Sequence, residues 1–337
     1  MLSAPAESWH SAVVLRLEFT AEDVLGTRFA EGPAPLIELC ATIALVQQQR
    51  PAAVFAPWVT RIRRTGLPTA VQPLTALIPP SGRGPLFLDP PAADLSVALD
   101  RVRSAPPELV AADLRRICPA ERPVTAWTSA LGRMEHEPWH SVERALEAGF
   151  DTLLAPHWPR VQAAFQADVA WRNETVARCG LGRMLADLLP GGHWEGSTLV
   201  LPARRDLRVP VGGNGLTLLP TTMWTGEALF GCYPDGTALL VYPALTPLPV
   251  VDTDPGGGPA LTDLLGSTRA AVLRVLHTPH TTTGLARELG ISPASASEHA
   301  KTLRAAGLVA TCRQGKAVLH TRTLLGTRLG SAVNMTT

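Results

Sequence analysis

The sequence predicts an α+β protein with two domains. The first is a mostly helical N-terminal domain that includes a small antiparallel sheet, and the second is a short C-terminal domain of three helices and a β-hairpin. Three observations predict this division: apolar residues recur at helical spacing up to about residue 190, short β-rich runs fill residues 196–243, and a glycine-rich run follows at 255–259. With 46% hydrophobic residues, the 337-residue chain is long enough to bury a sizeable core.

The N-terminal domain, residues 1–254, is predicted to contain a short helix capped by Thr20 and, after a turn at 31–33, an apolar helix from Pro35 to about Gln49. Proline pairs divide the next segment into short helices, because proline donates no backbone hydrogen bond and clashes with the preceding turn. Longer helices are expected between about 141 and 189, where the helical spacing is clearest. The β-rich runs, expected to form one antiparallel sheet, are 198–201, 207–209, 216–219 and 238–242.

Charge is distributed unevenly, although the formal net charge is only +1. Residues 260–337 contain nine Lys or Arg side chains and three acidic ones, a formal charge of +6, whereas the rest of the chain carries −5. Positive charge beside phosphate gains free energy by releasing condensed counterions, so the C-terminal part is the candidate for binding a polyanion. We expect a linker at 255–260, a basic domain at 261–331 and a tail at 332–337.

Capping residues predict three helices in the basic domain. Ser267 suits the N-cap of the first helix, and Thr281 or Thr282 suits that of the second. The second helix is expected to end at Gly290, because glycine readily adopts the left-handed conformation that closes a helix. Ser292 then caps the third helix, and the proline that follows it occupies the first helical position, where its missing N–H costs nothing.

Two helices joined by a short turn with a glycine form the helix-turn-helix arrangement, whose second helix normally enters the major groove of DNA with its N-terminal end. Residues 292–306 are therefore the predicted recognition helix. Residues 308–322 are predicted to form a hairpin with two cations at its tip, which completes a winged helix-turn-helix and suits the DNA backbone or minor groove. The candidate DNA-contacting residues are Thr281, Ser292, Ser295, Ser297, Glu298, His299, Lys301 and Thr302 of the helices, and Arg313, Gln314 and Lys316 of the wing.

Five segments of this domain carry a family resemblance, namely LGSTR at 265–269, LRVL at 273–276, LARELGIS at 285–292, SEH at 297–299 and LRAAGLV at 303–309. In order and spacing they resemble the ArsR-like winged-helix repressors. The resemblance implies that Ser297 and His299 contact DNA, that Arg313 and Lys316 lie on the wing, and that the protein is a homodimer. Metal-sensing members carry a paired-cysteine motif in the first helix of the helix-turn-helix, and residues 285–289 contain no cysteine.

Four segments of the N-terminal domain, LEFTAED at 17–23, TRF at 27–29, APHWP at 155–159 and WTG at 224–226, carry a second resemblance. They are similar to the large, poorly characterised domain that precedes this winged helix in some one-component bacterial regulators. That resemblance implies a sensor domain with an effector of unknown identity. We expect a cytoplasmic repressor that binds a double-stranded DNA operator as a homodimer, responds to a small-molecule effector and has no contact with a membrane, since no apolar run approaches the ~18 residues of a membrane span.

Two alternatives come from other functional classes: an enzyme with an appended winged helix, and a winged-helix adaptor for protein contact. Residues 136–140, HEPWH, have the spacing of a zinc-protease motif, in which both histidines lie on one face of a helix. We expect Pro138 to begin the helix here, which leaves His136 outside it and argues against a zinc site. Residues 212–215 predict a hairpin turn rather than a phosphate loop. The five cysteines are never closer than 53 residues, so they form no local metal motif. We expect no catalytic residues, no metal and no cofactor.

The tryptophans at 158, 171, 194 and 224 allow two interpretations. Aromatic residues at helical spacing favour core packing. Aromatic side chains also line pockets for apolar or planar ligands, so a pocket in the N-terminal domain is the alternative.

Overall fold

The computed structural model of the chain describes residues 13–52, 54–121, 123–245, 257–276, 278, 280–314, 317–323, 326 and 329. The chain divides into two compact units, Met1–Val250 and Val251–Thr337. The predicted mixed α+β class is confirmed. Within the described residues, no helix is both long enough and apolar enough to span a membrane.

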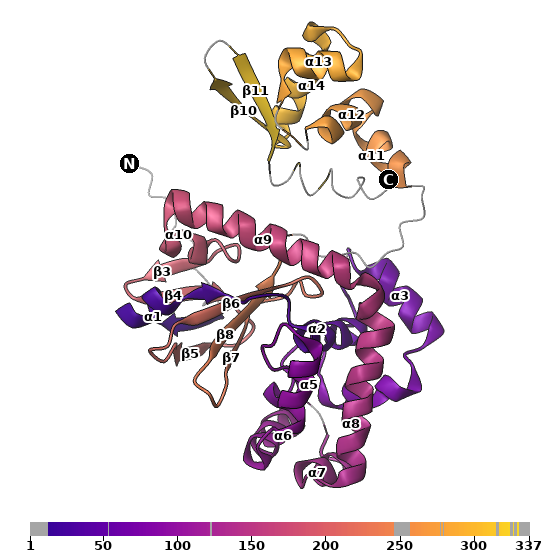
Figure 1. Cartoon of the computed structure of the whole chain (residues 1–337), viewed down its shortest axis with the longest axis vertical. Helices are drawn as coiled ribbons and strands as arrows, with labels where there is room; N and C mark the ends of the chain where they lie inside the picture. The colour runs from indigo at the N-terminus through magenta and orange to yellow at the C-terminus, as the bar shows by residue number, and fades with distance from the viewer. Residues whose placement is uncertain are drawn as a thin grey trace, which may run out of the picture. The chain divides into compact units, whose positions relative to one another are not determined.

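The N-terminal unit contains more helices than strands, as predicted. Its helices are α1 (Ala21–Gly26), α2 (Pro35–Gln47), α3 (Ala56–Thr65), η1 (Thr69–Val71), α4 (Gln72–Leu77), η2 (Leu86–Leu88), α5 (Leu95–Arg103), α6 (Pro107–Glu121), α7 (Ala126–Gly132), α8 (His136–Gly149), η3 (Phe150–Leu154, a π-helix), η4 (Ala155–His157), α9 (Trp158–Cys179) and α10 (Leu181–Ala186). Its strands are β1 (Val14–Glu18), β2 (Arg28–Phe29), β3 (His193–Glu195), β4 (Thr198–Pro202), β5 (Leu207–Pro210), β6 (Leu216–Thr221), β7 (Leu229–Cys232) and β8 (Ala238–Pro243). In Figure 1, helices α5–α8 lie to one side of the strands, and α9 extends from this group across to the strands.

The strands form two four-stranded sheets, ordered β3-β4-β1-β5 and β2-β6-β8-β7. The expectation of one antiparallel sheet was wrong, because β1 pairs in parallel with β5 and β6 pairs in parallel with both β2 and β8. Two of these pairs arise because β1 and β2, which come from the first 30 residues, insert beside strands nearly 200 residues later in the sequence. The third arises because β7, which lies between β6 and β8 in the sequence, pairs with the other side of β8. Such distant pairing leaves no local signal, since each strand resembles any other short apolar run.

The turn at 212–215 connects strands of different sheets, so it does not close the predicted hairpin. Asp23 of α1 accepts hydrogen bonds from the backbone N–H groups of Gly213 and Gly215, at 2.7 and 3.2 Å, and also completes a capping box with Thr20. These hydrogen bonds lower the pKa of Asp23 against the opposing effect of burial. Gly215 has φ +81°, and a Cβ there would lie 2.2 Å from the carbonyl carbon of Gly26, so only glycine fits. The turn amides bind a carboxylate of the same chain.

Helix α2 is buried along nearly its whole length, from Pro35 to Val46. It packs into a helical core and also into a smaller cluster, where Ile37 contacts the layer formed by Phe165 of α9 and Leu239 of β8. Its expected end at about Gln49 lies two residues beyond the observed end, Gln47. A helix that is apolar on every side belongs in the interior, which agrees with its sequence.

Glu38 is the acidic side chain within α2, and only 2% of it is exposed. Its carboxylate accepts hydrogen bonds from the Thr221 hydroxyl at 2.9 Å, the Thr222 N–H at 2.9 Å and the Met223 N–H at 3.1 Å. Burial raises the pKa of Glu38, and the hydrogen bonds only partly oppose this effect. The carboxylate thereby joins α2 to the end of β6, where the chain leaves the sheet.

A second buried polar contact joins α9 to β8. Asp168 accepts a hydrogen bond from the Tyr242 hydroxyl at 2.8 Å and another from the Leu245 N–H at 2.9 Å. Arg172, one turn along α9, lies 3.7 Å from the same carboxylate and donates to the Asp187 carbonyl at 2.9 Å. Buried charges are tolerated when they are paired in this way.

Helix α8 begins at His136, with Glu135 as its N-cap, so the expectation that His136 lies outside the helix was wrong. Pro138 occupies the third helical position, which also lacks a backbone acceptor for its N–H and therefore tolerates proline. The rings of His136 and His140 are 4.3 Å apart, edge to face. Across the described residues, no group of three His, Cys, Asp or Glu side chains is placed to hold a metal ion.

We predict that Glu38→Ala lowers the free energy of unfolding of the N-terminal unit by about 3 kcal/mol or more, because it leaves two buried N–H groups without an acceptor, each costing roughly 1–3 kcal/mol. Urea unfolding followed by tryptophan fluorescence measures this unit, since all eight tryptophans lie before residue 225. The control, Glu174→Ala, removes a glutamate that is 65% exposed on α9, and is expected to change stability by less than about 1 kcal/mol. Equal effects of the two variants would contradict the role given to Glu38.

Candidate nucleic-acid interface

The second unit contains α11 (Gly257–Leu265), α12 (Ser267–Val275), β9 (His280–Thr281), α13 (Thr282–Leu289), α14 (Pro293–Ala305), β10 (Val309–Gln314) and β11 (Ala317–Arg322). The strands form a three-stranded antiparallel sheet in the order β10-β11-β9. The helices and the hairpin therefore follow in the predicted order, with one additional helix, α11, and one additional short strand, β9.

Two expectations at the start of this unit were wrong. Residues 257–260, assigned to the linker, belong to α11, because Pro259 falls in the first turn and the apolar residues after it continue the helix. The N-cap of α12 is Gly266, with φ +79°, so Ser267 is the first helical residue and not the cap. The left-handed backbone of Gly266 separates the two helices and replaces a side-chain cap.

The turn between α13 and α14 agrees with its prediction. Gly290 ends α13 in the left-handed conformation, at φ 64° and ψ 30°, and the N–H of Ile291 donates to the Ala286 carbonyl at 3.0 Å. The Ser292 hydroxyl accepts from the Ser295 N–H at 3.1 Å, and Pro293 begins α14. Together these local preferences fix the angle between the two helices of a helix-turn-helix.

Helix α14 has one buried row and one exposed face. Ala296, Ala300 and Leu303 are buried on the side of the helix that faces α12 and α13. The hydrophobic core of this unit consists of Val272, Leu273, Leu276, Leu285, Ala286, Ala296, Leu303, Leu308 and Val309. Ser297, Glu298, Lys301 and Thr302 are exposed, and Ser295 and His299 are half-buried. The predicted contact residues of the helix therefore share a solvent-facing surface with its N-terminal turn. Their contact with DNA stays a prediction.

The two predicted cap residues already use their hydroxyl oxygens. Thr281 accepts a hydrogen bond from the Gly284 N–H at 3.1 Å, as Ser292 does from Ser295. A hydroxyl that accepts one hydrogen bond can still donate its proton, so both groups remain able to donate to a phosphate oxygen.

The charged residues on the exposed face of α14 form a loose ion pair. Lys301 Nζ lies 3.8 Å from Glu298 Oε1, and both side chains are about two-thirds or more exposed. Exposed pairs of this kind contribute only about 0–1 kcal/mol, so Lys301 can exchange this partner for a phosphate at little cost. Lys301 and Lys316 are the two lysines of the chain, in which all other basic side chains apart from histidine are arginines.

The predicted wing is a hairpin in which β10 and β11 pair in register from Val309 with Arg322 to Gln314 with Ala317. Both strands lie within the range 308–322 predicted for the hairpin. Lys316 and the side chains of Arg313 and Gln314 lie outside the described residues. Their contact with DNA also stays a prediction.

A buried histidine, which no sequence pattern indicated, joins the wing to the helices. His320 of β11 is 5% exposed, and its two ring nitrogens are hydrogen-bonded to the Thr282 hydroxyl at 2.9 Å and the Thr311 hydroxyl at 3.1 Å. Burial, and secondarily the charge of Arg304, lower the pKa of His320 below its ordinary value of 6.5. A histidine inside a short alternating strand gives no local sign of this role.

Two further arginines of this unit, one structural and one exposed, were not among the predicted DNA-contacting residues. Arg322 of β11 donates to the carbonyls of Leu273 and Arg274, at 2.6 and 2.8 Å, and so ties the sheet to the end of α12. Arg304 is exposed on the last turn of α14. Its position on the same helix as Lys301 makes it a further candidate for phosphate contact, outside the N-terminal half of the helix that the helix-turn-helix arrangement indicates.

We predict that the second unit loses stability as pH falls from about 7.5 to 5.5. Burial lowers the pKa of His320 in the folded state below the ordinary value of 6.5 at which the unfolded chain binds the proton, so the stability contributed by the neutral ring is full above that pH and declines below it. Hydrogen exchange of α14 amides in the full chain, corrected for the intrinsic pH dependence of exchange, measures the change. His320→Gln is expected to flatten the dependence and His280→Gln to retain it; the reverse pattern would exclude His320 as the titrating group.

A family model described as a helix-turn-helix domain matches residues 264–312. Comparison with curated proteins and with solved structures gives no match. The matched residues run from the end of α11 to β10 and include α13, the turn at Gly290 and the whole of α14. The C-terminal part of the chain is therefore a helix-turn-helix domain, the kind of domain with which transcription regulators bind DNA.

Proposed function

We propose that the protein is a homodimeric, ArsR-like transcription repressor without enzymatic activity, which binds an operator through α14 and the wing and is controlled by an effector of its N-terminal unit. The observation that carries the proposal is the exposed polar face of α14, whose N-terminal turn follows the left-handed turn at Gly290. For a protein that acts on DNA and resembles one-component bacterial regulators, the expected location is the cytoplasm.

The chemistry of this face suits base recognition. Ser297 and His299 supply groups that can donate and accept hydrogen bonds, and the Glu298 carboxylate can accept from the amino group of cytosine. Lys301 supplies a cation for guanine or for phosphate. The aligned peptide dipoles of α14 add positive partial charge at its N-terminal end, which is the end that approaches the DNA.

Charge supports the same proposal. The +6 of residues 260–337 contrasts with the −5 of the remaining chain, so the field that attracts a polyanion comes from the helix-turn-helix domain. An adaptor for protein contact has no need of this separation, which favours DNA over the adaptor alternative.

A two-fold symmetric dimer would present two α14 helices to half-sites about 34 Å apart, one turn of the double helix. An effector that binds one arrangement of the N-terminal units more tightly than another would change the spacing of these helices and hence operator affinity. The free energy of this coupling is limited by the difference in effector affinity between the two arrangements.

We predict that Ser297→Ala and His299→Ala each weaken binding to an operator, selected from random duplexes with the full-length protein, by about 1–3 kcal/mol. Affinity for an unrelated duplex should change little, because base contacts contribute nothing there. Fluorescence anisotropy with both duplexes provides the measurement, and Ser267→Ala, at an exposed serine of α12, is the control. Equal losses on both duplexes would show that these residues do not recognise bases.

We predict that replacing both Arg313 and Lys316 with alanine lowers the slope of log affinity against log salt concentration by about two units, because each cation that neutralises a phosphate adds about one unit to the slope. The control replaces Arg64 and Arg144, two exposed arginines of the N-terminal unit, and should leave the slope unchanged. An unchanged slope in the wing variant excludes the wing from the interface. Absence of binding to any duplex at ~50 mM salt would overturn the DNA-binding function itself.

A further inference from the structure

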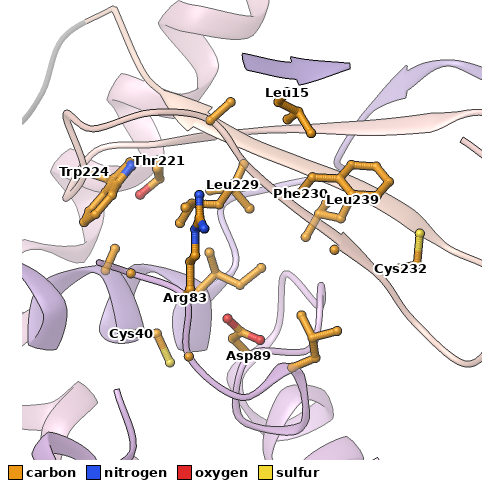
Figure 2. Close-up of a pocket in the computed structure, with 18 of the residues that line it drawn as sticks. Leu15, Cys40, Arg83, Asp89, Thr221, Trp224, Leu229, Phe230, Cys232 and Leu239 are labelled. Carbon is orange, nitrogen blue, oxygen red and sulfur yellow. The ribbon is translucent and has the colours of Figure 1, made fainter. Parts of the chain in front are cut away.

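The N-terminal unit contains a cavity of about 380 Å³. Figure 2 shows it between the strands that carry Leu229, Phe230 and Leu239 and the loop that carries Arg83 and Asp89. Helix α2 contributes Ile37, Cys40 and Ala41 to the wall. This volume falls within the range of about 300–1,000 Å³ that small-molecule sites occupy.

The wall is mostly apolar and includes the aromatic side chain of Trp224. Trp224 is 2% exposed, belongs to the helical core and also lines the cavity, so one of the four tryptophans considered from the sequence combines both interpretations. Its indole N–H donates to the Glu227 carbonyl at 2.8 Å, which fixes the ring. A rigid apolar wall of this kind accepts the hydrocarbon or aromatic part of a ligand.

Two of the guanidinium groups at the cavity already have carboxylate partners. Arg83 Nη2 lies 2.9 Å from Glu227 Oε1, and Arg116 Nη2 lies 3.2 Å from Asp113 Oδ1 and 2.9 Å from the Gly84 carbonyl. A ligand anion would have to compete with these internal carboxylates. The arrangement therefore does not favour a negatively charged ligand.

Asp89 differs from these groups, because its Oδ1 atom is buried and has no hydrogen-bond partner within the described part of the chain. Its backbone carbonyl is used, accepting from the Tyr233 hydroxyl at 2.9 Å, which holds the residue in place. Burial and the neighbouring charge of Asp113 raise the pKa of Asp89 to about 8, with Arg116 opposing the shift. A buried carboxyl oxygen without a donor costs free energy that a ligand donor can recover.

We propose that this cavity binds a small amphipathic amine, whose protonated amino group donates to Asp89 and whose apolar body packs against Trp224, Leu229 and the apolar part of α2. With its pKa raised to about 8, the Asp89 carboxyl is mostly protonated at neutral pH in the ligand-free protein. An ammonium group favours the charged carboxylate and also supplies the donor that its oxygen lacks, whereas a neutral donor supplies only the hydrogen bond. The role of such an amine as the effector rests on the proposed repressor function, whereas its binding to the N-terminal unit does not.

The test uses the full chain and three probes that share a fluorescent dansyl group. Dansylcadaverine carries a terminal ammonium, N-hexyl dansylamide carries a methyl group in its place, and the 5-hydroxypentyl analogue carries a hydroxyl. Dansyl emission rises on entry into an apolar site, so each titration gives a dissociation constant. We expect the amine to bind at least tenfold more tightly than either neutral probe, corresponding to about 1.4 kcal/mol.

The variant Asp89→Asn keeps the size of the side chain and removes its ability to carry charge. It is expected to weaken binding of the amine at least tenfold and to leave the N-hexyl probe unchanged. Asp151→Asn, at an exposed aspartate of η3, is the matched control and should leave all three probes unchanged. Thermal unfolding of each variant confirms that it folds.

Hydrogen exchange locates the amine independently. Protection is expected within residues 82–89 and 229–233, the two segments that contribute the loop and β7 residues of the cavity wall. Equal binding of the hydroxyl and ammonium probes, unchanged amine binding by Asp89→Asn, protection confined to other segments, or no saturable amine binding up to about 1 mM would each overturn the proposal. Operator binding by the ligand-free protein is measured separately, so a failure here is distinguishable from a failure of the DNA-binding function.

Discussion

The buried carboxylate of Glu38 connects the helical and the β-rich halves of the N-terminal unit. Helix α2 is enclosed on every side, so its polar side chain must find partners inside the protein, and it finds them where the chain leaves β6. This contact also fixes the segment from Thr221 to Trp224, whose two end residues line the cavity. The position of the helix, the exit of the strand and one wall of the cavity therefore share a single set of hydrogen bonds, and such buried networks specify one arrangement when every member is satisfied.

Different kinds of interaction determine the structures of the two units. The N-terminal unit relies on buried polar contacts between segments far apart in sequence, such as Asp23 with the turn at 212–215 and Asp168 with Tyr242. The helix-turn-helix domain relies on local preferences, because its caps and glycine turn lie within a few residues of the helices they end. The domain is small, and its core is completed by the hairpin, where His320 and Arg322 join the strands to the helices. Its shape is thus set by neighbouring residues and secured by a few contacts from β11.

The same difference explains what the sequence could predict. Thr20, Thr281, Gly290 and Ser292 were identified as helix ends because capping chemistry is local, and the buried row of α14 follows from helical periodicity. The two mixed sheets were not predictable, since β1 pairs with strands almost 200 residues away. His136 was misplaced because proline is tolerated throughout the first turn and not only at its first position. The cavity was foreseen only as one possible role for a tryptophan, and the unpartnered oxygen of Asp89 depends on packing that no spacing rule contains.

The placement of the lysines has a chemical consequence. Residues 301 and 316 are the only side chains of the chain that end in a primary amine, and residue 301 is well exposed on α14. Arginine keeps its charge under conditions that acylate amines. Mild acylation therefore removes positive charge from side chains of the helix-turn-helix domain alone and leaves the 21 arginines of the N-terminal unit charged. The electric field that the helix-turn-helix domain presents to a polyanion can thus be reduced by one reagent, while every arginine of the unit that contains the cavity keeps its charge.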